Sequence, residues 1–289
     1  MNPLQKAFSF PIKKGQFKKS DTLMDIGVTR ILANDPMPVK NYGELMDLVS
    51  KLAFFNRGYV MFFRGQSEEY TLGGRFPTIY PTYFRKLIQN TTSIEKLTDM
   101  LYVEQEILQL KNHHRKPRFH GASSIMESLH VRWALLQHYE ICDTPLIDIT
   151  QSLHVAASFA LMNKPKTKDA TGIIYVLALP WPSKNYHNNK EEELYLVRLA
   201  GITPPQAKRP YRQEAYAAMS QDVDSKQTSQ LERYDFARRV VGKFEINNSP
   251  EFWGDVIKPL PKAFLAPKED VFYKFMKEDP KINEINSFR

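Results

Sequence analysis

The feature that most constrains this chain is an unbroken apolar run, residues 173–179, which follows Gly172 and stops at Pro180. The run is rich in β-branched residues and is far shorter than the roughly 18 apolar residues of a membrane-spanning helix. A strand without a polar side belongs inside a sheet, where both of its faces are covered. The pattern therefore predicts a central strand over 172–179.

A second apolar run, 59–62, continues into Phe63-Arg64-Gly65. This arrangement places a permanently charged guanidinium at the end of a predicted buried strand. The five N–H donors of arginine form a planar fork that suits a phosphate better than a protein core. The structural alternative is a salt bridge from Arg64 to Glu68 or Asp148.

A third predicted strand, 144–149, ends in two hydroxyl residues, Thr150 and Ser152, immediately before a helix that begins near Leu153. Hydroxyls at this position could support a ribose, and they could equally cap the helix that follows. An arginine and hydroxyls at the ends of neighbouring strands predict a pocket for a phosphate and a sugar.

The remaining patterns predict an α+β fold with a mostly antiparallel or split central sheet. Residues 1–40 contain four prolines and scattered lysines and are expected to form an irregular arm, whereas 41–289 form a single domain. Helical spacing is found over five segments: 42–53, 82–89, 93–110, 123–139 and from 153 to the stop at Lys164-Pro165. A weaker strand is expected at 194–199. Three further segments complete the fold, 212–219, 231–246 and 269–275, and the last two are expected to be partly helical.

Composition narrows the class of function. The net charge of +8 and pI of about 9.3 favour a polyanionic partner such as RNA or DNA, although ordinary solvated surface explains any one basic cluster equally well. One cysteine, Cys142, excludes an internal disulfide, and the chain has no apolar span or signal segment, so a cytoplasmic protein without membrane contact is expected. The sequence has no Gly-rich phosphate loop, GxSxG or HExxH motif, and no metal site is expected.

The chain resembles the FRG domain family. The resemblance is carried by Phe63-Arg64-Gly65, by the Tyr80–Arg85 segment, by Leu136-Gln137-His138-Tyr139 through Thr150, and by Ala156-Ala157-Ser158-Phe159-Ala160, and it extends from about Asn41 to about Phe275. Two positions differ from the family pattern, because Glu140 stands where FRG domains often have glycine after His-Tyr, and Ala215 replaces another glycine.

A more distant resemblance is to ADP-ribosyltransferases of the Arg-Ser-Glu type, and it implies an ADP-ribosyltransferase-like fold with NAD as substrate. Carried over by residue, Arg64 takes the arginine role and Thr150-Gln151-Ser152 the hydroxyl motif. Glu214, which follows Gln213, is the candidate acid, although Arg212 occupies the place where these transferases have Glu or Gln. Glu232 has the better Gln-x-Glu spacing but lies in a segment that reads as helical, so it ranks second.

The resemblance also implies roles around the substrate. Arg64 would bind the pyrophosphate, Thr150 and Ser152 would support the ribose, and Glu214 would stabilise positive charge on the sugar. The wider set of candidate NAD-binding residues adds His138, Tyr80, Tyr139 and Gln213, with either tyrosine stacking on the nicotinamide. The plain alternatives are helix capping for the hydroxyls, a solvated surface position for Glu214 and a core histidine for His138.

Three functions follow from these residues. The first is an NAD-dependent ADP-ribosyltransferase of toxin or phage-defence type that modifies a nucleic acid or a protein, with an antitoxin or inhibitor protein as a candidate partner whose existence the sequence leaves open. The second is an NAD glycohydrolase on the same fold. The third is a non-catalytic module that binds a nucleotide or nucleic acid.

Overall fold

The computed structural model describes residues 8–9, 18–19, 31–32, 34–72, 76–88, 101, 105, 125, 128–220, 234–270 and 272–274. The chain divides into two compact units. Unit 1 comprises Met1–Ile79, Ile149–Trp181 and Asp235–Lys262, and unit 2 comprises Tyr80–Asp148, Pro182–Tyr234 and Ala263–Arg289. Most of the predicted arm and of the predicted helix 93–110 lies outside the described residues.

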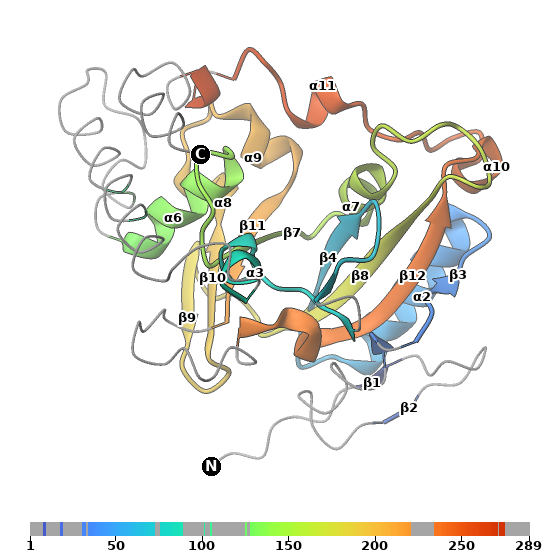
Figure 1. Cartoon of the computed structure of the whole chain (residues 1–289), viewed down its shortest axis with the longest axis horizontal. Helices are drawn as coiled ribbons and strands as arrows, with labels where there is room; N and C mark the ends of the chain where they lie inside the picture. Colours follow the sequence, from blue (N-terminus) through green and yellow to red (C-terminus); the bar gives the residue numbers. More distant parts are fainter. Residues whose placement is uncertain are drawn as a thin grey trace. The chain divides into compact units, whose positions relative to one another are not determined.

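The sheet of unit 1 is organised around β8 (Thr171–Leu179), which confirms the predicted central strand. Figure 1 shows β8 between β4 (Val60–Gln66) and β12 (Val240–Asn247), and it pairs antiparallel with both. β3 (Met37–Pro38) joins the far side of β12 in parallel, and Thr150 of β7 (Ile147–Thr150) pairs with Phe63 of β4. Every residue of β8 from Gly172 to Leu179 is buried.

Two helices, α2 (Tyr42–Phe55) and α7 (Leu153–Ala160), pack on one face of this sheet. A side chain at Gly65 would place its Cβ 1.9 Å from the carbonyl oxygen of Ala156, and one at Gly172 would place its Cβ 2.3 Å from that of Ala160. Only glycine permits this approach, because the obstructing atoms belong to the backbone of α7. The glycine of the Phe-Arg-Gly motif is therefore required by helix packing.

Unit 2 contains an antiparallel ladder of β9 (Tyr186–Asn189), β10 (Leu194–Arg198) and β11 (Ala215–Met219), with β10 in the middle. The helix α6 (Leu129–His138) packs against β10 and β11. Its N-cap, Ser128, accepts a hydrogen bond from Val131 N at 3.4 Å. The imidazole of His130 stacks on the ring of Tyr195 with 4.2 Å between centroids, which fixes the α6 face of the ladder.

Short elements complete the description. They are β1 (Phe8–Ser9), β2 (Lys18–Lys19), β5 (Thr71–Leu72), β6 (Phe76–Pro77), α3 (Thr82–Ile88), α8 (Leu199–Ile202), α9 (Lys208–Arg212), the 3-10 helix η3 (Phe236–Arg239), α10 (Pro250–Trp253) and α11 (Lys262–Leu265). In the described part of the chain, no helix is long and apolar enough to cross a bilayer.

The α+β class with a mostly antiparallel sheet is confirmed, because the ladders named above are antiparallel except β12 with β3. Residues 231–246 were expected to be partly helical, and their described part agrees, because it contains η3, which is followed by the long strand Val240–Asn247. The reason for the strand is tertiary, because the backbone of β12 completes the free side of β8 and its β-branched residues fit a buried sheet.

Candidate functional site

Arg64 projects from the face of the unit 1 sheet that is opposite α7. Gly65 faces α7, and successive residues of a strand alternate between faces. In the ladder Arg64 stands directly opposite Tyr175, and Tyr175 stands opposite Lys243 of β12. Side chains directly opposite one another share a face. Arg64, Tyr175 and Lys243 therefore form a polar row across three neighbouring strands.

One carboxylate, that of Glu69, contacts two members of this row, Lys243 and Tyr175. The side chain of Lys243 is only 2% exposed, and its ammonium forms an ion pair with Glu69 and donates to the carbonyl oxygens of Leu32 and Asn34 at 3.2 and 2.9 Å. The Tyr175 hydroxyl donates to Glu69 Oε1 at 3.4 Å. A buried ammonium with three acceptors is well compensated.

The electrostatics of the row point to a fixed guanidinium. Burial is the main reason that the pKa of Tyr175 is raised, and the Glu69 carboxylate adds to the effect. The charge of Arg64 acts in the opposite direction on the pKa of the same phenol, which shows that the guanidinium lies within electrostatic reach of it. Arg64 is half-buried and lies on a central strand, so its side chain projects from a rigid backbone.

Thr150 and Ser152 lie in the same unit, at the entrance to α7. Thr150 is the ladder partner of Phe63, so the two candidate motifs occupy adjacent strands. Thr150 is buried, and its Oγ1 accepts a hydrogen bond from Ser152 N at 3.0 Å. Because Phe63 lies on the α7 face, Thr150 lies on that face too, opposite to Arg64. The structure therefore does not bring these two predicted side chains together, and the structural task of Thr150 is to hold the turn into the helix.

Ser152 is the N-cap of α7. Its hydroxyl oxygen accepts from Val155 N at 3.4 Å, as the capping alternative predicted. A serine hydroxyl that accepts one hydrogen bond still carries a proton to donate. The capping role and a ligand-binding role for Ser152 are therefore compatible.

Glu214 occupies a conformation that is unusual for its residue type. It stands immediately before β11 with a φ of 44°, in the left-handed region, and it is exposed. Non-glycine residues in this region carry local strain, which is often associated with functional sites. Its charge raises the pKa of Tyr216, two residues further on, although burial is the larger cause of that shift.

Gln213 has a structural role next to this turn. Its side chain is buried and its Nε2 donates to the carbonyl oxygen of Leu265 at 2.8 Å. The neighbouring Arg212 donates to the carbonyl oxygen of Phe264 at 3.1 Å. Both contacts fasten the chain before β11 to the segment that contains α11, and they hold the backbone from which Glu214 projects.

His138 is a core histidine in the structure. Its side chain is buried, and its Nδ1 lies 3.3 Å from Asp148 Oδ1, while Gln137 Nε2 donates to Asp148 Oδ2 at 3.3 Å. Burial lowers the pKa of His138 more than the hydrogen bond to Asp148 raises it, so the ring is neutral at pH 7. This geometry supports the core alternative for His138.

The two candidate stacking tyrosines are also buried. Tyr139 is 0% and Tyr80 is 8% exposed. The Tyr139 hydroxyl donates to the Asp270 carboxylate at 3.4 Å, and burial is the main reason that its pKa is raised. Stacking either ring on nicotinamide would require the surrounding side chains to move.

Glu140, which replaces a frequent glycine, has a φ of 55°. This left-handed backbone explains the preference for glycine after His-Tyr, because glycine adopts it without strain. In this chain the Glu140 carboxylate pairs with Arg209, whose guanidinium also lies 5.9 Å from the ring centroid of Tyr139. The exchange of glycine for glutamate is thus accompanied by a new ion pair.

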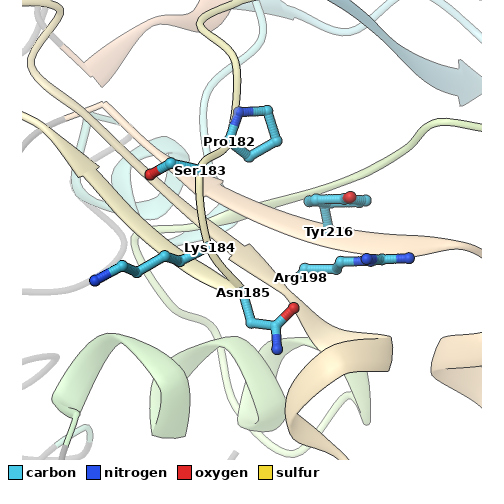
Figure 2. Close-up of a pocket in the computed structure, with 6 residues that line it drawn as sticks. All are labelled: Pro182, Ser183, Lys184, Asn185, Arg198 and Tyr216. Carbon is cyan, nitrogen blue, oxygen red and sulfur yellow. The ribbon is translucent and has the colours of Figure 1, made fainter.

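Sequence reasoning missed the buried ion pair in the row of Arg64 and a pocket in unit 2. Lys243 interrupts the apolar run of β12, and a lysine inside a buried strand could have indicated a buried acid, but nothing local identifies that acid as Glu69. The pocket, lined by Arg198, Tyr216 and four residues of 182–185, is shown in Figure 2. The alternative acid Glu232 lies outside the described residues.

Comparison with known proteins supports one family. Residues 60–169 match the family model of the FRG domain, which confirms the predicted resemblance over a shorter range than expected. The match includes Arg64, Thr150 and Ser152, whereas Gln213 and Glu214 lie beyond it. No curated protein and no solved structure matches the chain. The chain therefore carries an FRG domain over residues 60–169.

Proposed function

We propose that this FRG-domain chain is a cytoplasmic, NAD-dependent ADP-ribosyltransferase of toxin or phage-defence type. The observation that carries the proposal is the ladder pair between Phe63 and Thr150. It places Arg64 on the strand next to the one that leads to Ser152, within one unit, although Arg64 and Thr150 lie on opposite faces of the sheet. A guanidinium and the Ser152 hydroxyl, beyond the end of the neighbouring strand, are suited to a pyrophosphate and a ribose.

The proposed reaction breaks the N-glycosidic bond between nicotinamide and ribose. Nicotinamide leaves with the bonding electron pair, positive charge develops on the sugar, and a nucleophilic atom of the acceptor forms the new bond and releases its proton. Arg64 would hold the pyrophosphate, and the Ser152 hydroxyl would donate to the ribose. Such positioning can supply several orders of magnitude in rate.

Glu214 would supply the carboxylate that stabilises the charge on the sugar. Its exposed side chain and its left-handed backbone at a strand end support this role. A fixed carboxylate of this kind typically contributes about 100-fold or more to the rate.

The test is to incubate the purified protein with NAD labelled in its adenylate part, together with RNA, DNA or lysate protein. The chain offers a close control for Glu214, because Glu193 also precedes a strand, β10, with a φ of 50° in the same unit. We expect Glu214→Gln to reduce labelling about 100-fold and Glu193→Gln to leave it unchanged. Arg64→Ala should also abolish labelling, whereas Arg57→Ala, an exposed arginine of unit 1, should not.

The outcomes separate the candidate functions. Absence of both labelled acceptor and released nicotinamide with the wild-type protein contradicts any NAD-consuming activity. Nicotinamide release without a labelled acceptor selects the glycohydrolase, because water is then the acceptor. Nucleotide binding without turnover selects the binding module.

A further inference from the structure

Unit 2 contains a polar pocket on the face of its ladder that is opposite α6. Tyr195 faces α6, so alternation along β10 places Arg198 on the other face, together with its ladder partner Tyr216. The 182–185 segment supplies the remaining wall, and the cavity measures about 380 Å³. Figure 2 shows Arg198 and Tyr216 side by side, with Asn185 nearby and Lys184 directed the other way.

The charge in this pocket is uncompensated. Its lining contains two cations, Arg198 and Lys184, and no carboxylate. Among the residues that the structure describes, no ion pair involves either of these two side chains. Other cations of unit 2 do have partners, since Lys86 pairs with Asp143 and Arg209 pairs with Glu140. The pocket is therefore a concentrated positive site.

The backbone around the pocket is braced. Arg198 N donates to the carbonyl oxygen of Asn185 at 2.7 Å, and Asn185 Nδ2 donates to the carbonyl oxygen of Gly201 at 3.0 Å. Tyr216 is 5% exposed, and because burial raises the pKa of its phenol, the hydroxyl keeps its proton and can donate. A guanidinium and a neutral phenol on neighbouring strands thus offer several donors to one anion.

We propose that this pocket binds a backbone phosphate of a nucleic-acid strand, and that this strand is the acceptor of ADP-ribose. Arg198 and Tyr216 take one phosphate, and Lys184, whose side chain is directed the other way (Figure 2), takes a neighbouring phosphate. The acceptor role rests on the proposed function, whereas binding of the strand does not. Glu214 lies two residues before Tyr216, so a strand held here passes close to the candidate carboxylate.

A nucleic acid fits these observations better than a protein acceptor. A strand presents phosphates at regular spacing, which matches two cations of one pocket whose side chains are directed different ways, and the net charge of +8 attracts it over a longer range. The lining is mostly polar and includes no apolar side chain that could anchor a protein except Pro182.

The experiment measures the fluorescence anisotropy of short labelled RNA and DNA oligonucleotides, without NAD, over a series of salt concentrations. Arg198→Gln should weaken binding about 5- to 10-fold and reduce the slope of log K against log salt by about 1, as expected for the loss of one phosphate contact. The control is Lys190→Gln, which removes the same charge at an exposed position between β9 and β10. It should leave the affinity within about 2-fold of the wild type.

Arg198→Lys separates the pocket from folding, because it keeps the charge and loses only the planar fork. It should show an intermediate affinity and an unchanged unfolding midpoint. Equal weakening by Arg198→Gln and Lys190→Gln overturns the proposal, since binding would then follow net charge alone. Displacement of the oligonucleotide by an equal nucleotide concentration of mononucleotide, or a raised KM for NAD in Arg198→Gln, also overturns it. A failure of NAD turnover leaves these binding results intact and contradicts only the proposed function.

Discussion

The two units each contain an arginine directly opposite a tyrosine in an antiparallel ladder, and the two pairs differ in what surrounds them. In unit 1, Arg64 and Tyr175 share a face with Lys243, and Glu69 compensates the row. In unit 2, Arg198 and Tyr216 line a cavity whose other cation, Lys184, has no acid beside it. The same pair is thus set in a compensated row in one unit and in an uncompensated pocket in the other.

This difference assigns different tasks to the two arginines. A charge on a central strand, in one row with a buried ion pair, projects from a rigid backbone, and it can position a ligand at a defined point. A charge that lacks a counterion attracts an anion from solution, and that attraction weakens with salt. We therefore expect changes in the row of unit 1 to affect stability and changes in the pocket of unit 2 to affect binding.

The largest expected effect is on the pH dependence of stability, and it tests whether the interior of unit 1 disfavours the charged form of a buried carboxyl group. Burial raises the pKa of Asp235 from 3.8 to about 6, and its Oδ1 accepts from Ile79 N and Ala237 N. Between these two pH values the folded state keeps a proton that the unfolded state has lost, so the free energy of unfolding falls as pH rises from 4 to 6. The loss is about 3 kcal/mol at 1.36 kcal/mol per pKa unit.

Urea unfolding of the wild type and Asp235→Asn at several pH values checks this slope. The asparagine Oδ1 can accept the same two hydrogen bonds but does not titrate. The difference in unfolding free energy between variant and wild type should therefore rise with pH over this range. Parallel pH profiles for the two proteins would show that Asp235 titrates normally.

The next effect concerns the acid that compensates the row. Glu69→Gln leaves the ammonium of Lys243 buried without its counterion and should lower the unfolding free energy by about 2 kcal/mol. Glu68→Gln, at the exposed neighbouring position, removes the same charge and should have almost no effect. Chemical unfolding of both variants measures their unfolding free energies, and equal values would show that Glu69 does not compensate the charge of Lys243.

The serine N-caps of α7 and α6 have the same hydrogen-bond geometry, so replacing each of them compares the two units directly. Ser152 caps α7 and Ser128 caps α6, each by a 3.4 Å hydrogen bond from a valine N–H. Replacing either serine by alanine should cost about 1 kcal/mol of stability. Only Ser152→Ala should also reduce NAD-dependent labelling at a temperature where both variants are folded. A similar loss of labelling in both would assign Ser152 a capping role alone.

The smallest expected effect is the change in unfolding free energy when a residue of the unit 2 pocket is replaced. Arg198→Gln should change the unfolding free energy by no more than about 0.5 kcal/mol, because the side chain is exposed and has no ion pair among the described residues. A loss similar to that of Glu69→Gln would show that Arg198 has a structural partner. Thermal and urea unfolding of the same preparation used for oligonucleotide binding measures it.

Local sequence patterns predicted the elements whose structure depends mainly on residues that are close in the sequence. The apolar run 172–179, the helical spacing of 42–53 and the small residues of α7 all lie where the sequence placed them. The described part of 231–246 is partly helical, as expected, but the pattern did not identify the long strand β12, because pairing with β8 decides the structure there. Segment 93–110 is not tested, since only Leu101 and Gln105 of it are described.

The candidate site was predictable only in part, for a related reason. The Phe-Arg-Gly motif identifies Arg64 and a glycine, but the closeness of Gly65 to Ala156 is a tertiary contact. Tyr139 was a plausible stacking residue in the sequence, and its burial against Asp270 depends on a partner 131 residues away. The contribution of each candidate to NAD binding stays a prediction.

The central claim is that Arg64 binds the pyrophosphate of NAD, and isothermal titration of NAD into the wild type, Arg64→Lys and Arg57→Ala tests it most directly. The account predicts saturable binding to the wild type, binding weaker by about 10- to 100-fold in Arg64→Lys because the planar fork is lost, and no change in Arg57→Ala. Equal affinity of the wild type and Arg64→Lys for NAD, or no binding by the folded wild type, would contradict it.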